Sequence, residues 1–534
     1  MHRIFLPLFL LMSPLAFAQL VTGMDVAVAD TESGPVRGYI SDGIYTYKGI
    51  PYARADRFES PRKPEPWTEV RSSMSWGPVA PLLTPTTAVP DELEFVFDHD
   101  WGYPNEDCLR LNVWTPALDD GKKRPVMFWI HGGGFTAGSS QELPSYHGEN
   151  LARKGDVVVV SINHRLNILG FLDLSAYGEK YRSSANNSIV DMRVALEWVR
   201  DNIENFGGDP NNVTIFGQSG GGAKVNTLMA MPSARGLFHR AVNQSGAFRS
   251  GILEQSTTRA IAEAVVEDLG LTPATIDEIQ QVPFDTLAAA GRRALALVEE
   301  RMRAQGAPTH AFGLSWGPSV DGNVLPYQMY APEALALSEK VPLLIGTAKN
   351  EFMPSIRSGL SNASQQEIDT YLTNQYGEKA EAYRQAVRAA YPEDNRPTDL
   401  IDVDMTFRPG AVQQANLKSA LPEAAPVYMY LFTWQSPVLD GKYKALHCME
   451  IPFVFDNVER CRQMTGGGPA AQALADRVSS AWINFARTGD PNTEDLPRWE
   501  PYTEVNGATM MLNTESHLRY HPDRELLEFV NASR

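Results

Sequence analysis

Two stretches of the chain have the G-x-S-x-G spacing that is typical of a nucleophilic serine: residues 217–221, with Ser219, and residues 313–317, with Ser315. A serine hydroxyl attacks a carbonyl carbon when a neighbouring base takes its proton and amide donors stabilise the oxyanion. The spacing alone says little, because a chain with 41 glycines is expected to contain chance matches. The sequence around each serine therefore has to decide which one could react.

The sequence around Ser219 fits a nucleophile elbow, in which the serine stands on a sharp turn between a strand and a helix. The strand-like run NVTIF (212–216) precedes it, and GGGAKVNTLMAM (220–231) has the small and apolar residues of a helix. Such a turn leaves the serine beside the free amides of the helix N-terminus. After Ser315, Pro318 follows within three residues and excludes a helix of that form. We predict Ser219 as the nucleophile and Ser315 as a loop residue.

An acid and then a histidine follow the serine in the chain order of proteins with a nucleophile elbow. His447 lies a short loop after the predicted strand 427–434, where the last member of such a set is expected. The four other histidines that follow Ser219 lie too close to the serine, in a helical insertion or in a polar C-terminal segment: His239, His310, His517 and His521. We predict His447 as the general base.

Glu351 is the acid that the pattern favours. It follows the predicted strand VPLLIGT (341–347), and a carboxylate just past the carboxyl end of a parallel strand lies at the active edge of the sheet. Asp321, in a turn before that strand, is the competing candidate, since the chain order also allows it.

A glycine-rich loop supplies a second, independent indication. His131-Gly132-Gly133-Gly134-Phe135 lies at the end of the predicted strand segment 126–134, and loops of this type donate backbone N–H groups to an oxyanion. Glycines allow the chain to approach the substrate closely. A phosphate-binding loop is the alternative, but neither G-x-x-x-x-G-K-[ST] nor G-x-G-x-x-G is present.

The elements that would position these residues alternate between strands and helices, which predicts an α/β fold with a mostly parallel sheet and helices on both faces. Antiparallel strands are expected at the N-terminus, long loops at 53–106, and a late amphipathic helix at 479–489. The segments 255–304 and 364–420 are predicted to be large helical insertions. The predicted alternation comprises strands at 126–134, 156–163, 212–216, 241–246, 341–347 and 427–434, and helices at 186–206 and 220–231.

The composition and the N-terminal residues limit the possible ligands and the compartment of the protein. The net charge of −17 and the absence of a basic run give no support for binding nucleic acid or an anionic membrane. Residues 1–18 have a short positive start, an apolar stretch broken by Pro7 and Pro14, and the small-x-small end Ala16-Phe17-Ala18. This is typical of a signal peptide cleaved after Ala18. We expect a single domain over 19–534 in an exported protein without integral membrane association, periplasmic or secreted.

The chain has only three cysteines, which excludes a disulfide framework. Cys448 and Cys461 are close enough in sequence to pair in an oxidising compartment. Two unpaired thiols are the equal alternative.

With HGGGF, GQSGGG, GTAKNEF and HCMEIPFVF in this order, the chain resembles the type B carboxylesterase family, the cholinesterase-like branch of the α/β hydrolases. The likeness runs from about residue 30 to 515 and includes YKGIPYA, NEDCLRLNVWTP and ENFGGDPNNVTIFGQSGG. The resemblance implies Ser219 as nucleophile, Glu351 as acid and His447 as base. It also places the oxyanion donors at the N–H groups of Gly133, Gly134 and Gly220.

The chain departs from the family pattern at several positions. Gln218 stands where the family usually has glutamate, so we expect the site to lack a buried additional carboxylate. Gly220 replaces a common alanine, and Phe352 follows the acid where glycine is usual. Cys108 matches a family cysteine whose partner would fall near 79–82, where no cysteine exists, so Cys108 is expected to be a free thiol.

These patterns predict a serine carboxylesterase that hydrolyses small-molecule carboxylic esters through an acyl-enzyme on Ser219, without a cofactor or metal. Phe135, Trp316 and Phe352 are the candidates for lining the substrate pocket. The alternatives are hydrolysis of an amide, carbamate or lactone, a lipase acting at a membrane surface, and a non-catalytic, cholinesterase-like binding protein. The sequence predicts neither the physiological ester nor the oligomeric state.

Overall fold

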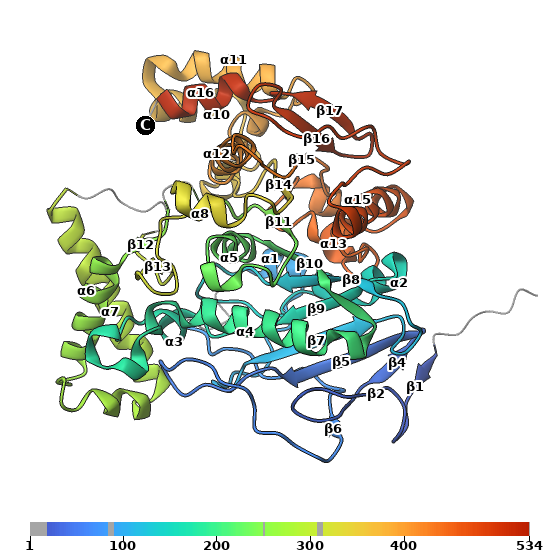
Figure 1. The fold of residues 1–534 in the computed structure, drawn as a ribbon. Coiled ribbons are helices and arrows are strands. Elements are labelled where there is room, and N and C mark those ends of the chain that lie inside the picture. The colour runs from blue at the N-terminus through green and yellow to red at the C-terminus, as the bar shows by residue number, and fades with distance from the viewer. Residues whose placement is uncertain (1–18, 84–89, 249–250, 307–312, 533–534) are drawn as a thin grey trace, which may run out of the picture.

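A twelve-stranded sheet runs through the computed structural model, which describes residues 19–83, 90–248, 251–306 and 313–532 (Figure 1). The predicted signal peptide, residues 1–18, lies outside the described residues. In spatial order the strands are β1 (Leu20–Val21), β4 (Tyr39–Ser41), β5 (Ile44–Pro51), β7 (Arg110–Thr115), β9 (Val158–Ile162), β8 (Arg124–Ile130), β10 (Gly208–Gln218), β11 (Arg240–Gln244), β14 (Leu343–Ala348), β15 (Val427–Phe432), β16 (Ala508–Leu512) and β17 (His517–Tyr520).

The middle of this sheet, from β9 to β16, is parallel, whereas β1, β4, β5 and β7 at one edge and β17 at the other pair antiparallel. The prediction of an α/β fold with a mostly parallel sheet and antiparallel N-terminal strands is confirmed. Among the antiparallel pairs, β4 and β5 are joined by the short turn 42–43 and β16 and β17 by residues 513–516, while each parallel pair needs a crossover long enough to hold a helix.

Strand β8 shows how the two faces of the sheet are filled. Val126, Phe128 and Ile130 belong to one hydrophobic core, and the intervening Met127 and Trp129 belong to the other. Successive side chains of a strand point to opposite faces, so an unbroken apolar run fits a strand that is buried on both sides. The first core is covered by α3 (Asn167–Phe171), α4 (Asn187–Asn202), α5 (Gly220–Met229) and α12 (Arg408–Ser419), and the second by α2 (Glu149–Gly155), α13 (Ile451–Val454) and α15 (Pro469–Thr488).

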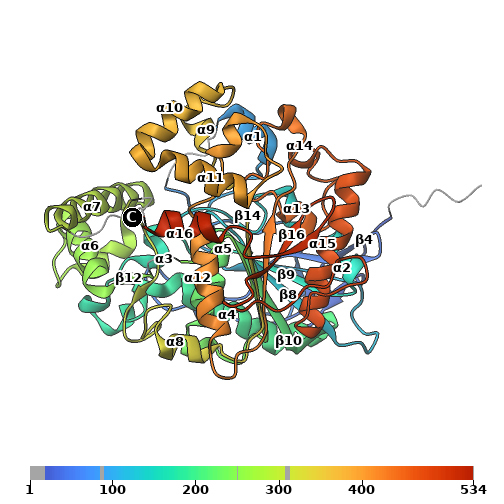
Figure 2. The same cartoon turned by 90° about the horizontal axis from the view of Figure 1, so that it is seen from above.

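The two predicted helical insertions are confirmed as helices, and Figure 2 shows them as two lobes beside the sheet. The first contains α6 (Gln255–Asp268) and α7 (Phe284–Ala304), which pack on the first core. The second contains α10 (Gln365–Tyr376) and α11 (Ala380–Ala390), which form a third core with α16 (Arg524–Ala532). Shorter helices are α1 (Asp91–Phe97), α8 (Pro332–Leu337), α9 (Pro354–Arg357) and α14 (Arg462–Thr465), and two small sheets join β2 (Val28–Ala29), β3 (Val36–Arg37) and β6 (Arg71–Ser72), and β12 (Leu253–Glu254) with β13 (Ser319–Val320).

Some elements differ from the sequence prediction. The segment 53–106 contains α1 in addition to loops, and the predicted helix at 479–489 begins ten residues earlier as α15, at Pro469. Strand β7 was not predicted because its sequence, RLNVWT, is not an apolar run. Its Asn112 is buried nonetheless, because the side-chain amide donates to the hydroxyls of Ser140 and Ser161, each at 3.0 Å.

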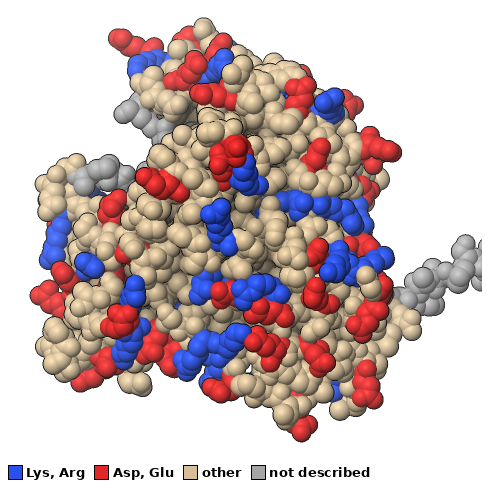
Figure 3. Space-filling model, viewed as in Figure 1, with Lys and Arg blue, Asp and Glu red and all other residues tan. Residues whose placement is uncertain are grey.

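On the face shown in Figure 3, lysine and arginine side chains are interspersed with aspartate and glutamate. Across the described parts of the chain, no helix combines the length and apolarity that a bilayer crossing requires.

Candidate active site

Ser219 lies on a strained turn between the last residue of β10, Gln218, and the first residue of α5, Gly220. Its backbone angles are φ 57° and ψ −126°, a region that residues with a side chain rarely adopt. The turn is held from both sides: the Ser219 N–H donates to the Gln244 carbonyl at 2.8 Å, and its carbonyl accepts from the Ala223 N–H at 3.0 Å. The strand–turn–helix geometry predicted for Ser219 is therefore confirmed.

Ser315, the serine of the second G-x-S-x-G match, is exposed in an irregular segment. No helix follows it, and the next element is the two-residue strand β13. It lacks the turn and the helix N-terminus that Ser219 has.

Glycines at the elbow are required because the loop after β8 packs directly against it. A Cβ atom on Gly220 would lie 2.2 Å from the Gly134 carbonyl oxygen and 2.4 Å from the Gly134 nitrogen. A Cβ atom on Gly221 would lie 2.0 Å from the carbonyl oxygen of Ile130. The backbones of the HGGGF loop and of the helix N-terminus thus touch, which brings the peptide groups of Gly134 and Gly220 together next to Ser219.

His447 and Glu351 form a hydrogen-bonded ion pair at the carboxyl edge of the sheet. His447 Nδ1 bonds to Glu351 Oε2, and the His447 N–H donates to the Glu351 carbonyl at 3.1 Å. The other carboxylate oxygen of Glu351 accepts from the Ser245 hydroxyl at 2.5 Å and from the Ala348 N–H at 2.8 Å. Glu351 is fully buried, so these partners fix its carboxylate and, through it, the imidazole.

The imidazole of His447 packs against two phenylalanine rings, which also contact each other, and against the elbow. Phe407 stacks on it at 5.2 Å between ring centroids, and Phe352 lies at 4.7 Å. The Gln218 side-chain nitrogen is 3.3 Å from Nδ1 and 3.4 Å from Nε2. Because Gln218 directly precedes Ser219, the imidazole is beside the elbow, although no hydrogen bond joins the Ser219 hydroxyl to another described residue. Catalytic hydrogen bonds of this kind often form only when substrate is bound.

The expectation that the site lacks a buried additional carboxylate is wrong. Glu450, three residues after His447, is buried and accepts a hydrogen bond from the Gln244 side chain at 3.1 Å. Burial, together with the charge of Glu351, raises the pKa of Glu450 to about 7. Asp404 is a further buried carboxyl, bonded to the N–H groups that open α12, and burial and the Glu351 charge raise its pKa to about 7. Although position 218 holds an amide, two other buried carboxyls thus act on His447 through their charge.

The pKa of His447 reflects two opposing influences. Burial favours the neutral ring and lowers the pKa. The charge and hydrogen bond of Glu351, with smaller contributions from Glu450 and Asp404, favour the imidazolium. The carboxylates outweigh burial, so the pKa is raised above the ordinary histidine value of 6.5.

The three candidate pocket residues lie in two places. Phe135 adjoins Gly317, on which a Cβ would be 3.6 Å from its ring, and the buried Trp316 has its ring against Gly291 of α7. Phe352 lies instead against the imidazole and keeps 36% of its surface exposed. Phe407, which the sequence analysis did not single out, shares this second position.

The competing candidates have structural roles elsewhere. The Asp321 carboxylate accepts from the N–H groups of its own turn, 323–325, and from Asn186. His239 Nδ1 accepts from the Val213 N–H at 3.1 Å. His517 is exposed and His521 is partly exposed, both near the sheet edge. Their rings bond to the carbonyls of Glu515 and Val505, respectively. His310 lies outside the described residues.

The three cysteines all lie in the described residues, and all are unpaired. The expected free thiol at Cys108 is confirmed, and Cys448 and Cys461 are not joined. The Cys448 thiol instead donates to the Gln218 side-chain oxygen at 3.2 Å, which orients the Gln218 amide nitrogen towards His447.

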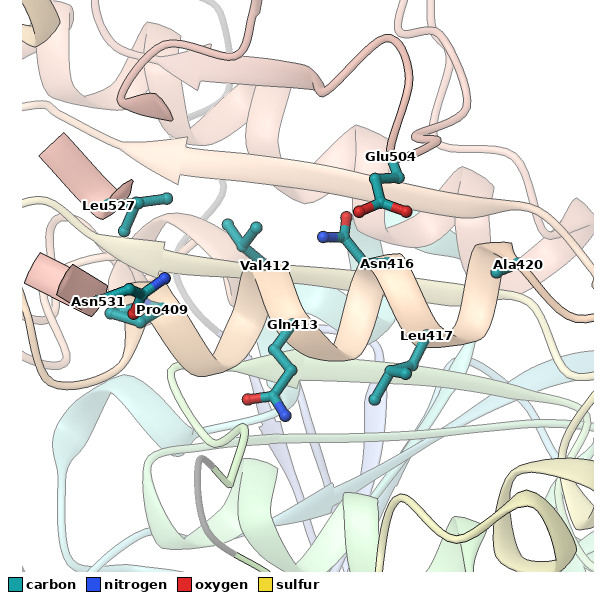
Figure 4. A pocket seen from close by; sticks show the side chains of 9 residues that line it. All are labelled: Pro409, Val412, Gln413, Asn416, Leu417, Ala420, Glu504, Leu527 and Asn531. Carbon is teal, nitrogen blue, oxygen red and sulfur yellow. The ribbon is translucent and has the colours of Figure 1, made fainter. Parts of the chain in front are cut away.

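A separate groove of about 420 Å³ lies between α12 and α16 (Figure 4). None of the residues that the sequence points to is among its lining, which comprises Pro409, Val412, Gln413, Asn416, Leu417, Ala420, Glu504, Leu527 and Asn531. Within the parts of the chain that the structure covers, no group of three or more histidine, cysteine, aspartate or glutamate side chains is placed to hold a metal ion.

The chain is similar to known proteins over almost its whole length. The model of the carboxylesterase family matches residues 25–530. The para-nitrobenzyl esterase of Bacillus subtilis (strain 168) is 34% identical over 504 residues, covering 93% of this chain and 97% of the relative. The phenmedipham hydrolase of Pseudarthrobacter oxydans is 33% identical over 503 residues, with 91% and 95% covered.

A solved structure is similar over nearly the whole length. It is that of an esterase from the anaerobe Clostridium hathewayi, which can hydrolyse aliphatic aromatic polyesters. The TM-score is 0.84 at 38% identity, and the match covers 97% of this chain and 100% of the other.

Proposed function

The chain belongs to the carboxylesterase family of α/β-hydrolase-fold enzymes, and on that premise we propose that it hydrolyses carboxylic esters through an acyl-enzyme formed on Ser219. The observation that carries the proposal is the buried His447–Glu351 pair, held against Gln218 and so beside the elbow. An imidazole so placed is the base that a serine hydroxyl needs.

In the first step, the Ser219 oxygen attacks the ester carbonyl carbon while His447 Nε2 takes the hydroxyl proton. Glu351, bonded to Nδ1, keeps the ring in the required tautomer and stabilises the imidazolium. The N–H groups of Gly133, Gly134 and Gly220 hold the oxyanion, and each such donor is worth about 10²–10³-fold in rate.

Collapse of the tetrahedral intermediate breaks the bond to the alcohol oxygen, and the imidazolium gives that oxygen its proton. Water then attacks the acyl-enzyme, His447 takes a proton from the water, and the carboxylic acid is released with Ser219 regenerated. Phe352 and Phe407 pack against the imidazole, so both would contact the bound ester; Phe135, in the glycine loop, and Trp316 would line an apolar region of the pocket.

Labelling tests the assignment directly. An organophosphonate that reacts with activated serines is expected to modify the tryptic peptide 201–224, in which Ser219 is the single serine. Mass spectrometry locates the adduct. Modification of the peptide 304–340, which holds Ser315, with the first peptide left intact would contradict the proposal.

The pH dependence follows from the raised pKa of His447. The neutral imidazole is the base, so kcat/KM is expected to fall as the pH is lowered, with a midpoint above 6.5. Glu450→Gln removes a negative charge that favours the imidazolium, so the midpoint should move to lower pH in that variant. Rates measured with a neutral ester between pH 5 and 9 check both points, and a limb that stays in place in the variant would contradict the role given to Glu450.

Export stays a prediction that rests on residues 1–18, and a single domain over 19–534 rests on the sequence pattern.

A further inference from the structure

Lys224 is a fully buried lysine on the first turns of α5, five residues after Ser219. Its ammonium group donates to the His131 carbonyl at 3.0 Å and to the Gly132 carbonyl at 3.4 Å. No carboxylate among the described residues forms an ion pair with it within 4.0 Å. Burying a cation without an ion-pair partner is costly, so a lysine at this place calls for an explanation.

The bonded carbonyls belong to the HGGGF loop, and their direction fixes the direction of the next amides. A trans peptide is planar, and its C=O and N–H point in opposite directions. When the Gly132 carbonyl points to Lys224 beneath the loop, the N–H of Gly133 must point away from Lys224, to the other side of the loop. Gly133 has φ 81°, and a Cβ on Gly132 would lie 3.5 Å from the Ser219 Cβ, so this part of the loop adjoins the nucleophile.

We propose that Lys224 is a positioning residue of the oxyanion loop, whose charge orients the Gly132–Gly133 peptide and strengthens the Gly133 N–H as a donor to the oxyanion. A cation at the carbonyl end of a peptide polarises it, and hydrogen bonds in such a chain reinforce one another in a low-dielectric site. The inference rests on the proposed function, since it assigns the oxyanion to this loop.

The groups that face Lys224 favour a single positive charge there. His131 and His164 stack at 4.7 Å, and burial followed by the charge of Lys224 holds the pKa of His131 and His164 well below the ordinary value, so both rings are neutral. Burial lowers the pKa of Lys224 to about 7, and the negative charge of Glu142 opposes this shift. Burial also raises the pKa of Glu142 itself to about 7.

Lys418 provides a matched control. It is also buried, its ammonium group donates to the carbonyls of Ser338 and Glu339 at 2.6 and 3.1 Å, and burial lowers its pKa to about 8. It lies on α12, away from the glycine loop. Lys224→Met and Lys418→Met therefore remove the same kind of buried charge, one beneath the loop and one elsewhere.

The experiment compares both variants with the unmodified enzyme in two measurements. The first is the turnover of a neutral para-nitrophenyl ester. The second is the affinity for a trifluoromethyl ketone, whose adduct with the serine carries an oxyanion. Lys224→Met is expected to lower kcat about 10–100-fold with KM unchanged, somewhat less than the loss of a whole oxyanion donor. Its affinity for the trifluoromethyl ketone should fall by a similar factor. Lys418→Met should retain kcat and this affinity, whatever its effect on thermal stability.

The pH profile provides a readout that does not require the Lys224 variant to fold. The charged form exists below the pKa of Lys224, so kcat should decline as pH rises through a midpoint of about 7. Glu142→Gln removes a charge that keeps Lys224 protonated, so this decline should move to lower pH.

Two results would overturn the inference: equal kcat and equal ketone affinity in the Lys224 and Lys418 variants, or an alkaline limb that does not respond to Glu142→Gln. Failure of the proposed function is recognised separately, because the unmodified enzyme would then lack esterase activity or react with the phosphonate at a residue other than Ser219.

Discussion

Ser219→Ala is expected to lower kcat/KM for an ester by about 10⁵–10⁶-fold, because the variant lacks the atom that forms the acyl bond. Binding and the amide donors of the glycine loop stay in place, so a small residual rate above that in water should remain. The measurement is steady-state hydrolysis of a para-nitrophenyl ester, corrected for the uncatalysed rate. Retention of more than a few per cent of the activity would refute the assignment.

Ser315→Ala is the matched control, since this serine has the same G-x-S-x-G spacing but is exposed in an irregular segment. Its kcat/KM should remain within about twofold of the unmodified value, as for most surface substitutions. Circular dichroism of both variants checks that neither change has unfolded the chain.

Glu351→Gln is expected to lower kcat by about 10³–10⁴-fold at neutral pH, the scale seen when a triad carboxylate becomes an amide. The carboxylate accepts from His447 Nδ1, and its second oxygen accepts from Ser245 and Ala348. An amide of the same shape can donate to Nδ1, which would place the imidazole proton on the nitrogen that must receive one from Ser219. The side chain is fully buried, so water cannot replace the lost charge.

Asp321→Asn is the control for this change, because Asp321 is the other acid that the chain order allows. Its carboxylate caps a turn and bonds to Asn186, so the variant should lose some stability while the folded enzyme keeps its kcat. A large loss of kcat in Asp321→Asn, with Glu351→Gln active, would reverse the assignment. Kinetics at a temperature below the measured melting transition of both variants separate the two effects.

Much of the site could be predicted from the sequence because the parallel strands that support it are buried on both faces. Their apolar runs, such as VMFWI before the glycine loop, are visible without knowledge of the fold, and each candidate follows the end of one. Strand β7 could not be found in this way, since its buried Asn112 is stabilised by partners 28 and 49 residues away in the sequence.

The side chains around the proposed triad were harder to predict, because their partners are also distant in the sequence. A lysine within a helical pattern indicates a solvated face, and nothing local to Lys224 shows that its partners are the carbonyls of residues 131 and 132. Gln218 suggested a site short of acidic groups, whereas the charges of Glu450 and Asp404 raise the pKa of the imidazole, and the sequence does not display the packing that buries them near it. Phe407 stacks on His447 from forty residues upstream.

The three unpaired thiols have a consequence for how this enzyme is made. Burial raises the pKa of Cys108 and of Cys461 to about 12, and raises that of Cys448, so none of them is a ready thiolate. No covalent cross-link has to form or be shuffled on the way to the native state. The chain should therefore mature equally well with or without an oxidising folding catalyst, and a reductant added during purification should leave its turnover unchanged.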